Sequence, residues 1–148
     1  MRALGLDLGT KTIGLAVADE LGITAQGLKT IERRGPRKDL EALAERVAEF
    51  AVDRFVIGLP LNMDGSEGPR AEMTRKFGTG LEQFTRLPVI YWDERLTTVA
   101  AHRAISESGA SGKKRKEVID QVAAVLILQG WLDGQRPRES QHADDGED

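Results

Sequence analysis

The sequence predicts a mixed α/β sheet with helices on its faces, and three observations lead to that fold class. Three short apolar segments crowd the first 31 residues, which favours antiparallel strands. Apolar residues then recur at helical spacing, and short apolar runs separate these stretches, which favours βα units. The expected order is β-β-β-α-β-α-β-α-α, an antiparallel three-strand meander extended by parallel βα units.

The N-terminal meander is expected to contain strands at residues 3–8, 13–18 and 25–31. Gly9 follows the first strand, and Leu21-Gly22 lies between the second and the third. Glycine is common in tight turns because it tolerates positive φ. Short strands separated by such turns favour antiparallel pairing of neighbours.

After the meander, the spacing of apolar residues changes from that of strands to that of helices. Apolar residues recur at helical spacing over residues 39–50, and Asp39 is expected to cap that helix. Residues 54–59 form a nearly all-apolar run, as expected of a strand buried on both faces. Pro60 stops its ladder because proline has no N–H to donate.

The second half of the chain is expected to be mostly helical. Gly134 is expected to end the last helix, which has the most regular apolar stripe. The predicted elements are a helix at 71–86, a strand at 88–92, a helix from Thr97 or Thr98 to Ser108, a small basic loop at 109–116 and a helix at 116–133.

The composition is that of an ordinary globular domain. The 148 residues are 40% apolar and 30% charged. The absence of cysteine excludes disulfides, thiolate metal sites and a cysteine nucleophile. No basic and apolar leader and no apolar run of membrane-spanning length occur, so we expect a cytoplasmic protein with no membrane contact.

The charge is distributed unevenly between a folded part and a tail. The ten residues 139–148 carry five acids and no Lys or Arg, and without them the net charge changes from −3 to +2. Such a polar, acidic segment cannot bury apolar surface. We therefore expect one domain at 1–138, mildly basic, followed by a disordered acidic tail at 139–148.

Acidic residues from three separate elements form the candidate site. Asp7 stands inside the first apolar strand, Asp93-Glu94 follows the strand at 88–92, and Asp120 lies on the last helix. A carboxylate in a strand interior usually has a partner, and ligands collect where central strands end. Carboxylates without cysteine suit Mg²⁺ or Mn²⁺. Two such ions about 4 Å apart are a common apparatus for phosphodiester hydrolysis.

Simpler interpretations compete with this one. Asp7 could be a turn residue, Asp93 and Glu94 could cap the next helix, and Asp120 could be a solvated helix residue. The basic run of Lys113, Lys114, Arg115 and Lys116 could be a solvated loop or a loop that grips phosphate. The glycine-rich segment 58–68 could be an ordinary connection, or its N–H groups could meet phosphate.

Four segments together resemble the YqgF/RuvX family, whose members are described as Holliday junction resolvases or ribosomal RNA precursor nucleases with an RNase H-like fold. The resemblance spans nearly the whole chain before the tail, and the family often has Arg where this chain has Thr12. The four segments are Gly5-Leu6-Asp7-Leu8-Gly9-Thr10-Lys11-Thr12-Ile13-Gly14-Leu15-Ala16, Gly58-Leu59-Pro60-Leu61-Asn62-Met63-Asp64-Gly65-Ser66, Asp93-Glu94-Arg95-Leu96-Thr97-Thr98, and Asp120-Gln121-Val122-Ala123-Ala124 followed by Ile127-Leu128-Gln129 and Trp131-Leu132.

The resemblance implies an RNase H-like nuclease with catalytic, metal-binding carboxylates at Asp7, Glu94 and Asp120, and with Asp93 as an alternative ligand. It also implies residues that contact nucleic acid or support the site. These are Lys11, Asn62, Asp64, Arg95 and Thr97, with the basic run at Lys113, Lys114, Arg115 and Lys116 as a further contact.

The leading hypothesis is therefore a metal-dependent nuclease that acts on structured RNA, with a ribosomal precursor favoured, or on branched DNA. Resolution of a four-way junction requires two sites related by two-fold symmetry and predicts a homodimer, whereas RNA trimming can work as a monomer. One alternative is a phosphotransferase, because Asp7-Leu8-Gly9-Thr10 also looks like a phosphate loop of actin-like ATPases. The other is a non-catalytic nucleic-acid-binding or ribosome-assembly module.

Overall fold

A five-stranded mixed sheet forms the centre of the molecule. The computed structural model describes residues 2–97 and 113–135, with side chains in the second range from residue 119. The strand order is β3-β2-β1-β4-β5. Pairing is antiparallel for β1–β2 and β2–β3 and parallel for β1–β4 and β4–β5, which confirms the predicted meander and its parallel extension. The strands are β1 (Ala3–Leu8), β2 (Thr12–Ala18), β3 (Ala25–Glu32), β4 (Arg54–Leu59) and β5 (Val89–Asp93).

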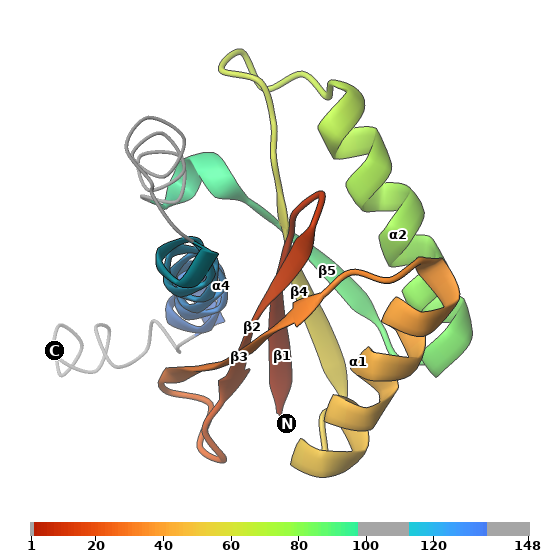
Figure 1. Ribbon diagram of the computed structural model, residues 1–148. Helices are drawn as coiled ribbons and strands as arrows, with labels where there is room; N and C mark the ends of the chain where they lie inside the picture. Colours follow the sequence, from red (N-terminus) through yellow and green to blue (C-terminus); the bar gives the residue numbers. More distant parts are fainter. Residues whose placement is uncertain (1, 98–112, 136–148) are drawn as a thin grey trace, which may run out of the picture.

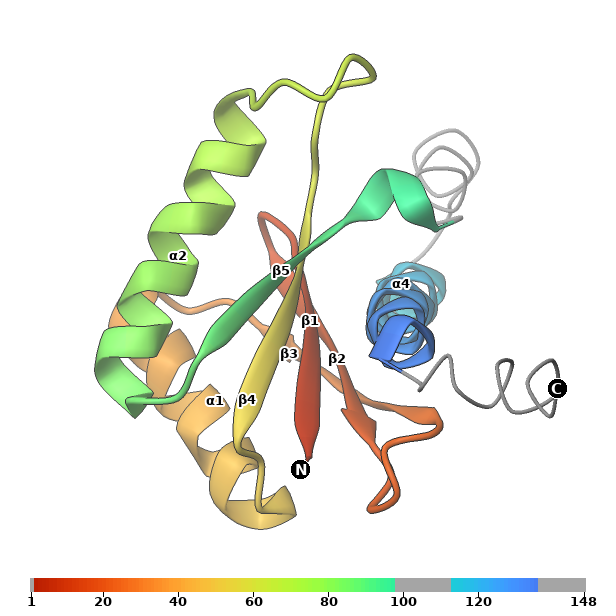
Figure 2. The same cartoon turned by 180° about the vertical axis from the view of Figure 1, so that it is seen from behind.

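Helices cover both faces of this sheet, as expected. In Figures 1 and 2, α1 and α2 lie on one side of the strands and α4 lies on the other. The described helices are α1 (Pro36–Phe50), α2 (Pro69–Thr85), the short 3₁₀ helix η1 (Glu94–Leu96) and α4 (Lys113–Gln135). None of them is long and apolar enough to cross a membrane.

Two separate apolar cores result, one on each face of the sheet. Alternation along each strand sends successive side chains to opposite faces. The face toward α4 contains many small residues, with Ala3, Ala16, Ala18 and Val56 packed on Ala123, Ala124, Ile127, Leu128, Trp131 and Leu132. The face toward α1 and α2 contains larger ones, among them Leu4, Leu6, Ile13, Leu15, Leu43, Phe55, Ile57 and Leu81.

The prediction that Asp39 caps a helix is wrong. The helix α1 begins three residues earlier, at Pro36, which suits the first turn because its missing N–H needs no partner there. Asp39 is 1% exposed and accepts hydrogen bonds from Arg33 Nε (3.1 Å) and from the Arg34 backbone N–H (2.8 Å). This carboxylate therefore anchors the loop before α1.

The last helix also begins earlier than expected, because the backbone of Lys113, Lys114, Arg115 and Lys116 is already helical. Lysine and arginine have good helix propensity, so a basic run extends a helix readily. The helix also continues one residue past Gly134. The predicted helix beyond Thr97, the residues 109–112 of the predicted loop and the tail at 139–148 lie outside the described residues.

Candidate functional site

The predicted carboxylates lie at one edge of the sheet. Because β1, β4 and β5 are parallel, their carboxyl ends meet at that edge. Asp7 is the last residue but one of β1, and Glu94 directly follows β5. Asp7 and Glu94 are only 2% and 5% exposed, respectively. Such burial is unusual for acidic residues and argues against their being solvated surface residues.

Asp7 and Asp120 lie on either side of Gly14. The strand register pairs Asp7 with Gly14, and a Cβ placed on Gly14 would lie 3.4 Å from the Asp7 Cβ. The same Cβ would overlap the backbone carbonyl oxygen of Asp120. The helix α4 thus approaches the β1–β2 hairpin so closely that only glycine fits between them, and this contact brings Asp120 beside Asp7.

Glu94 shares this face of the sheet. A Cβ placed on Gly58 would overlap Ile127 of α4 and would lie 2.8 Å from Glu94 Oε2. The Glu94 carboxylate therefore lies over the end of β4, under α4. Asp7, Glu94 and Asp120 come from three elements and converge on the α4 side of the strand ends.

Asp93 belongs to the opposite side. Along β5, Tyr91 contacts Gly78 of α2, whereas Trp92 contacts Gly130 of α4. Alternation returns Asp93 to the side of Tyr91. Its carboxylate accepts hydrogen bonds from the Arg95 backbone N–H (2.9 Å) and from Arg95 Nη2 (2.8 Å). The Arg95 guanidinium holds the pKa of the Asp93 carboxyl below its usual value.

The hydroxyl of Thr12 is an additional partner of the site. Thr12 Oγ1 donates a hydrogen bond of 2.7 Å to Asp120 Oδ2. Thr12 begins β2, at the strand edge where Asp7 and Glu94 lie. The bond orients the Asp120 carboxylate relative to the sheet, although Asp120 itself is carried by a helix.

The described side chains do not form a closed metal cage. Among residues 2–97 and 119–135, no three His, Asp or Glu side chains gather closely enough to hold one metal ion. The donor chemistry nevertheless suits a hard divalent cation, because all three converging groups are carboxylates. Mg²⁺ is commonly held by one or two carboxylates together with substrate phosphates rather than by a cage made only of protein.

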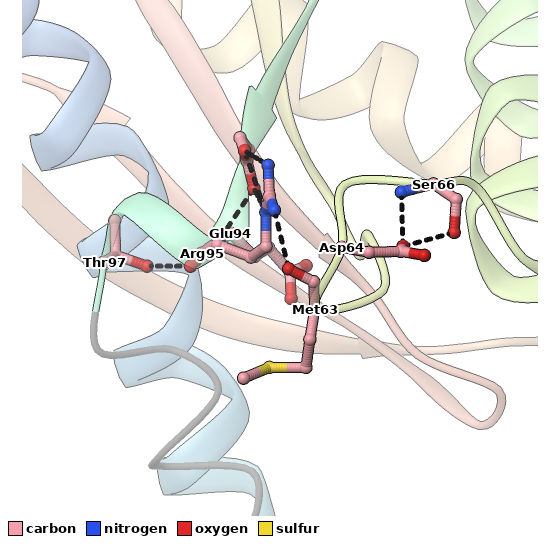
Figure 3. Close-up of polar contacts among 7 residues, drawn as sticks. Met63, Asp64, Ser66, Glu94, Arg95 and Thr97 are labelled. Carbon is pink, nitrogen blue, oxygen red and sulfur yellow. Dashed lines mark hydrogen bonds and ion pairs between the residues drawn. The ribbon is translucent and has the colours of Figure 1, made fainter.

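Arg95 connects the strand end to the loop after β4. Besides its contacts with Asp93, its Nη1 donates to the carbonyl oxygen of Met63 at 3.1 Å (Figure 3). The loop is also braced internally, because Asp64 Oδ1 accepts from both the backbone N–H (2.9 Å) and the hydroxyl (2.6 Å) of Ser66. Asn62 Nδ2 donates to Ser66 Oγ at 2.9 Å. These hydrogen bonds hold the loop after β4 in place next to η1.

The other predicted contact residues lie around the same edge. Lys11 is exposed on the β1–β2 turn, and Asn62 is exposed on the loop after β4. Thr97 Oγ1 donates to the Glu94 carbonyl oxygen at 3.0 Å and closes η1. The side chains of Lys113, Lys114, Arg115 and Lys116 lie outside the described residues, so their contact with nucleic acid stays a prediction.

Sequence reasoning missed the packing role of three glycines in central strands. Cβ atoms on Gly5, Gly14 and Gly58 would each come too close to α4. The signal was available, because an isolated glycine in a strand often marks a close approach of another backbone. The hydrogen bond from Thr12 had no comparable signal in the sequence.

Comparison with known proteins identifies relatives of the whole domain. The family model RuvX, described as Holliday junction resolvase, matches residues 1–134. A Myxococcus xanthus protein named "Putative pre-16S rRNA nuclease" is 58% identical over 146 residues, which are 98% of this chain and 97% of that protein. A protein of the same name from Moorella thermoacetica is 56% identical over 133 residues, covering 90% of this chain and 95% of that protein.

Solved structures confirm the fold class. The structure of T. thermophilus RuvC in complex with Holliday junction substrate has a TM-score of 0.58 and 13% identity, and the match covers 92% of this chain and 97% of that chain. A second structure of Thermus thermophilus RuvC has a TM-score of 0.50 and 14% identity, and the match covers 91% of this chain and 96% of that chain. The similarity shows that the chain has an RNase H-like fold.

Proposed function

The chain belongs to the RuvX family of nucleases, and we propose that it hydrolyses phosphodiester bonds with divalent metal ions held by Asp7, Glu94 and Asp120. One observation carries this proposal. Two almost fully buried carboxylates, Asp7 and Glu94, lie at the ends of different strands on the face that α4 covers, and α4 brings Asp120 to the same place.

Mg²⁺ or Mn²⁺ fits the hard oxygen donors of this set. When bound, such an ion would activate water and stabilise the oxygen that leaves the phosphorus. The protein contributes the position of the donors: the sheet holds Asp7 and Glu94, and the Thr12 hydroxyl holds Asp120. Oxygens of the substrate phosphate would complete the coordination of such an ion.

Asp93 and Arg95 would act at a distance from the scissile bond. Their ion pair and the bond from Arg95 to Met63 hold the loop after β4 beside the carboxylates. The exposed Asn62 on this loop and the exposed Lys11 on the β1–β2 turn would then border the path of the nucleic acid. Thr97 would keep η1, and hence Glu94, in place.

We propose a ribosomal RNA precursor as the substrate, because the curated relatives that cover nearly all of this chain are named for pre-16S rRNA. The description of the family as Holliday junction resolvases supports a branched DNA as the second candidate. A monomer suffices for RNA trimming, whereas symmetric cleavage of a junction requires a homodimer.

A cleavage assay in Mg²⁺ and in Mn²⁺ tests both candidates together. It compares single-stranded RNA, a fragment spanning the 5′ end of pre-16S rRNA, linear duplex DNA and a four-way junction. Cleavage restricted to RNA supports the RNA-processing function, and paired symmetric nicks in the junction support the resolvase function. Absence of metal-dependent cleavage of all four would favour a non-catalytic binding module.

The variants Asp7→Asn and Asp93→Asn form a matched pair for this assay. Both remove one carboxylate charge at the same edge of the sheet, but only Asp7 faces α4. We expect Asp7→Asn to lose cleavage and Asp93→Asn to retain a measurable rate. The reverse result would make Asp93 the metal ligand and would refute the proposed site.

A further inference from the structure

A basic cleft lies between β3 and α1, apart from the carboxylate edge. It has a volume of about 220 Å³, and its walls come from the second half of β3, the loop after it and the first three turns of α1. Four cationic side chains line it: Lys29, Arg34, Lys38 and Arg46. Glu32 and Asp39 are the two acidic residues in its wall.

The wall of this basic cleft has more cationic than acidic side chains, four against two. Asp39 is buried and already accepts hydrogen bonds from Arg33 and from the Arg34 backbone. Within the part of the chain that the structure describes, Lys29, Arg34 and Lys38 form no ion pair, and Arg46 reaches only Glu49, at 3.6 Å. An excess of positive charge along a concave surface favours a polyanion.

The basic cleft reaches the end of the sheet at which the carboxylates lie, on the face that α1 covers rather than on the α4 face. Glu32, in its wall, pairs with Thr12 of β2, and the Thr12 hydroxyl contacts Asp120. The backbone N–H of Arg33 donates to the carbonyl oxygen of Lys11 on the β1–β2 turn at 2.9 Å. A strand of nucleic acid at the carboxylates would therefore pass around the ends of β2 and β3 to reach the cleft, with several nucleotides between the two places.

We propose that the basic cleft binds the phosphodiester backbone of the nucleic acid substrate, at phosphates several positions away from the cleaved bond. This inference rests on the proposed nuclease function, because it assigns the cleft to the same substrate. The basic residues on α1 and β3 contribute affinity that does not depend on base sequence, since phosphate contacts carry no sequence information.

The test uses Lys38→Gln and Arg46→Gln, with Lys76→Gln as the matched control. Lys76 is an exposed lysine on α2 that does not line the cleft. Binding of a fluorescein-labelled 20-nucleotide single-stranded RNA and of a four-way DNA junction is measured by anisotropy in EDTA, at several salt concentrations. Thermal melting of each variant establishes that it is folded.

We expect Lys38→Gln and Arg46→Gln each to weaken RNA binding about fivefold at 0.1 M salt, because one phosphate contact on a single strand contributes about 0.7 to the salt slope. The slope should fall by about the same 0.7 in each variant, and Lys76→Gln should leave both quantities unchanged. Equal losses in all three variants, no loss at Lys38 and Arg46, or no binding of either probe by the wild-type protein would overturn the proposal.

The cleft and the nuclease function can fail separately. In one outcome, Asp7→Asn abolishes metal-dependent cleavage, but Lys38→Gln and Arg46→Gln bind RNA as the wild type does. This result refutes the proposed role of the cleft and leaves the nuclease function intact. Binding that requires Lys38 and Arg46, without cleavage in either metal, supports the cleft and refutes the nuclease function.

Discussion

The two faces of the sheet are built from different kinds of side chain. Under α4 the central strands carry glycine and alanine, so that the helix lies close to the backbone of the strands. Toward α1 and α2 the same strands carry leucine, isoleucine and phenylalanine, which keep those helices farther away and fill a thicker core. Each large buried side chain contributes about 1.5–3 kcal/mol to stability.

The difference indicates that the two faces of the sheet serve different purposes: the α4 face positions acidic side chains, and the α1 and α2 face contributes stability. Close approach of α4 brings Asp120 beside Asp7, which large residues at Gly14 or Gly58 would prevent. The core on the other side consists mainly of large aliphatic and aromatic side chains, whose main contribution is burial. Substitutions under α4 should therefore change activity first, and substitutions under α1 and α2 should change stability first.

The largest effect is expected for Asp7→Asn on the α4 face. The cleavage rate should fall by at least about 10³-fold, because the proposed metal interaction of this carboxylate would be worth several kcal/mol. Nucleic-acid affinity in EDTA should stay within about twofold. Single-turnover cleavage and anisotropy measure the two quantities. Loss of affinity together with cleavage would mean that Asp7 supports the fold rather than the chemistry.

A large-to-small substitution on the face toward α1 and α2 should lower the stability of the protein without lowering its cleavage rate. Phe55→Ala removes a fully buried ring and should lower the free energy of unfolding by about 3–5 kcal/mol. The folded fraction should cleave at the wild-type rate. Urea denaturation measures the free energy of unfolding, and cleavage kinetics normalised to the folded fraction measure the rate. Ile57→Val is a milder variant on the same face, and its expected cost is about 0.5–1.5 kcal/mol. A reduced rate in fully folded Phe55→Ala would break the separation between the faces.

Gly14→Ala tests the close contact with α4. The new methyl group would overlap the Asp120 carbonyl oxygen and force α4 away from β2. Displacing catalytic groups by about 1 Å can cost about 100-fold in rate. Gly80→Ala is the control, because a Cβ there meets no atom within 4 Å and alanine favours the helix. Equal rates for the two variants would show that the spacing of α4 does not control the site.

Thr12→Val should have a smaller effect on the same face. The variant leaves Asp120 Oδ2 without the hydroxyl donor, and a hydrogen bond to a charged group is worth about 1.5–3 kcal/mol. We expect the cleavage rate to fall at least about tenfold and the metal concentration for half-maximal activity to rise. Thr12→Ser keeps the hydroxyl and should restore both. Failure of serine to restore them would point to packing by the threonine methyl group instead.

The smallest effect concerns Asp93, on the α2 side of the strand ends. The hydrogen bond from Arg95 keeps the pKa of the Asp93 carboxyl below its usual value, so the pair stabilises the fold while this carboxyl is ionised. The stabilisation is lost as pH falls through the lowered pKa of the folded state. The Tm difference between wild type and Asp93→Asn should therefore be constant above about pH 5 and vanish in stronger acid. A difference independent of pH would exclude this ion pair as its source.

Much of the fold could be predicted from local patterns. Apolar periodicity located all five strands, and α1, α2 and α4, to within a few residues of their observed ends, because period and burial are encoded within each element. The prediction for Asp39 failed because its partner, Arg33, is held against the β1–β2 turn by its bond to the Gly9 carbonyl oxygen. A helix cap and a buried ion-pair residue look alike when only neighbouring residues are considered.

The sequence by itself determined the strand and helix order and the acidic residues worth considering, since those depend on residue type and spacing along the chain. It could not separate Asp93 from Glu94, which are adjacent in sequence and differ only in the face of the sheet to which they belong. Pairing of β5 with β4 decided that Glu94 joins Asp7 and Asp120 under α4. That decision, like the close approach of α4 at Gly14, depends on contacts between residues far apart in the chain, which only the tertiary structure brings together.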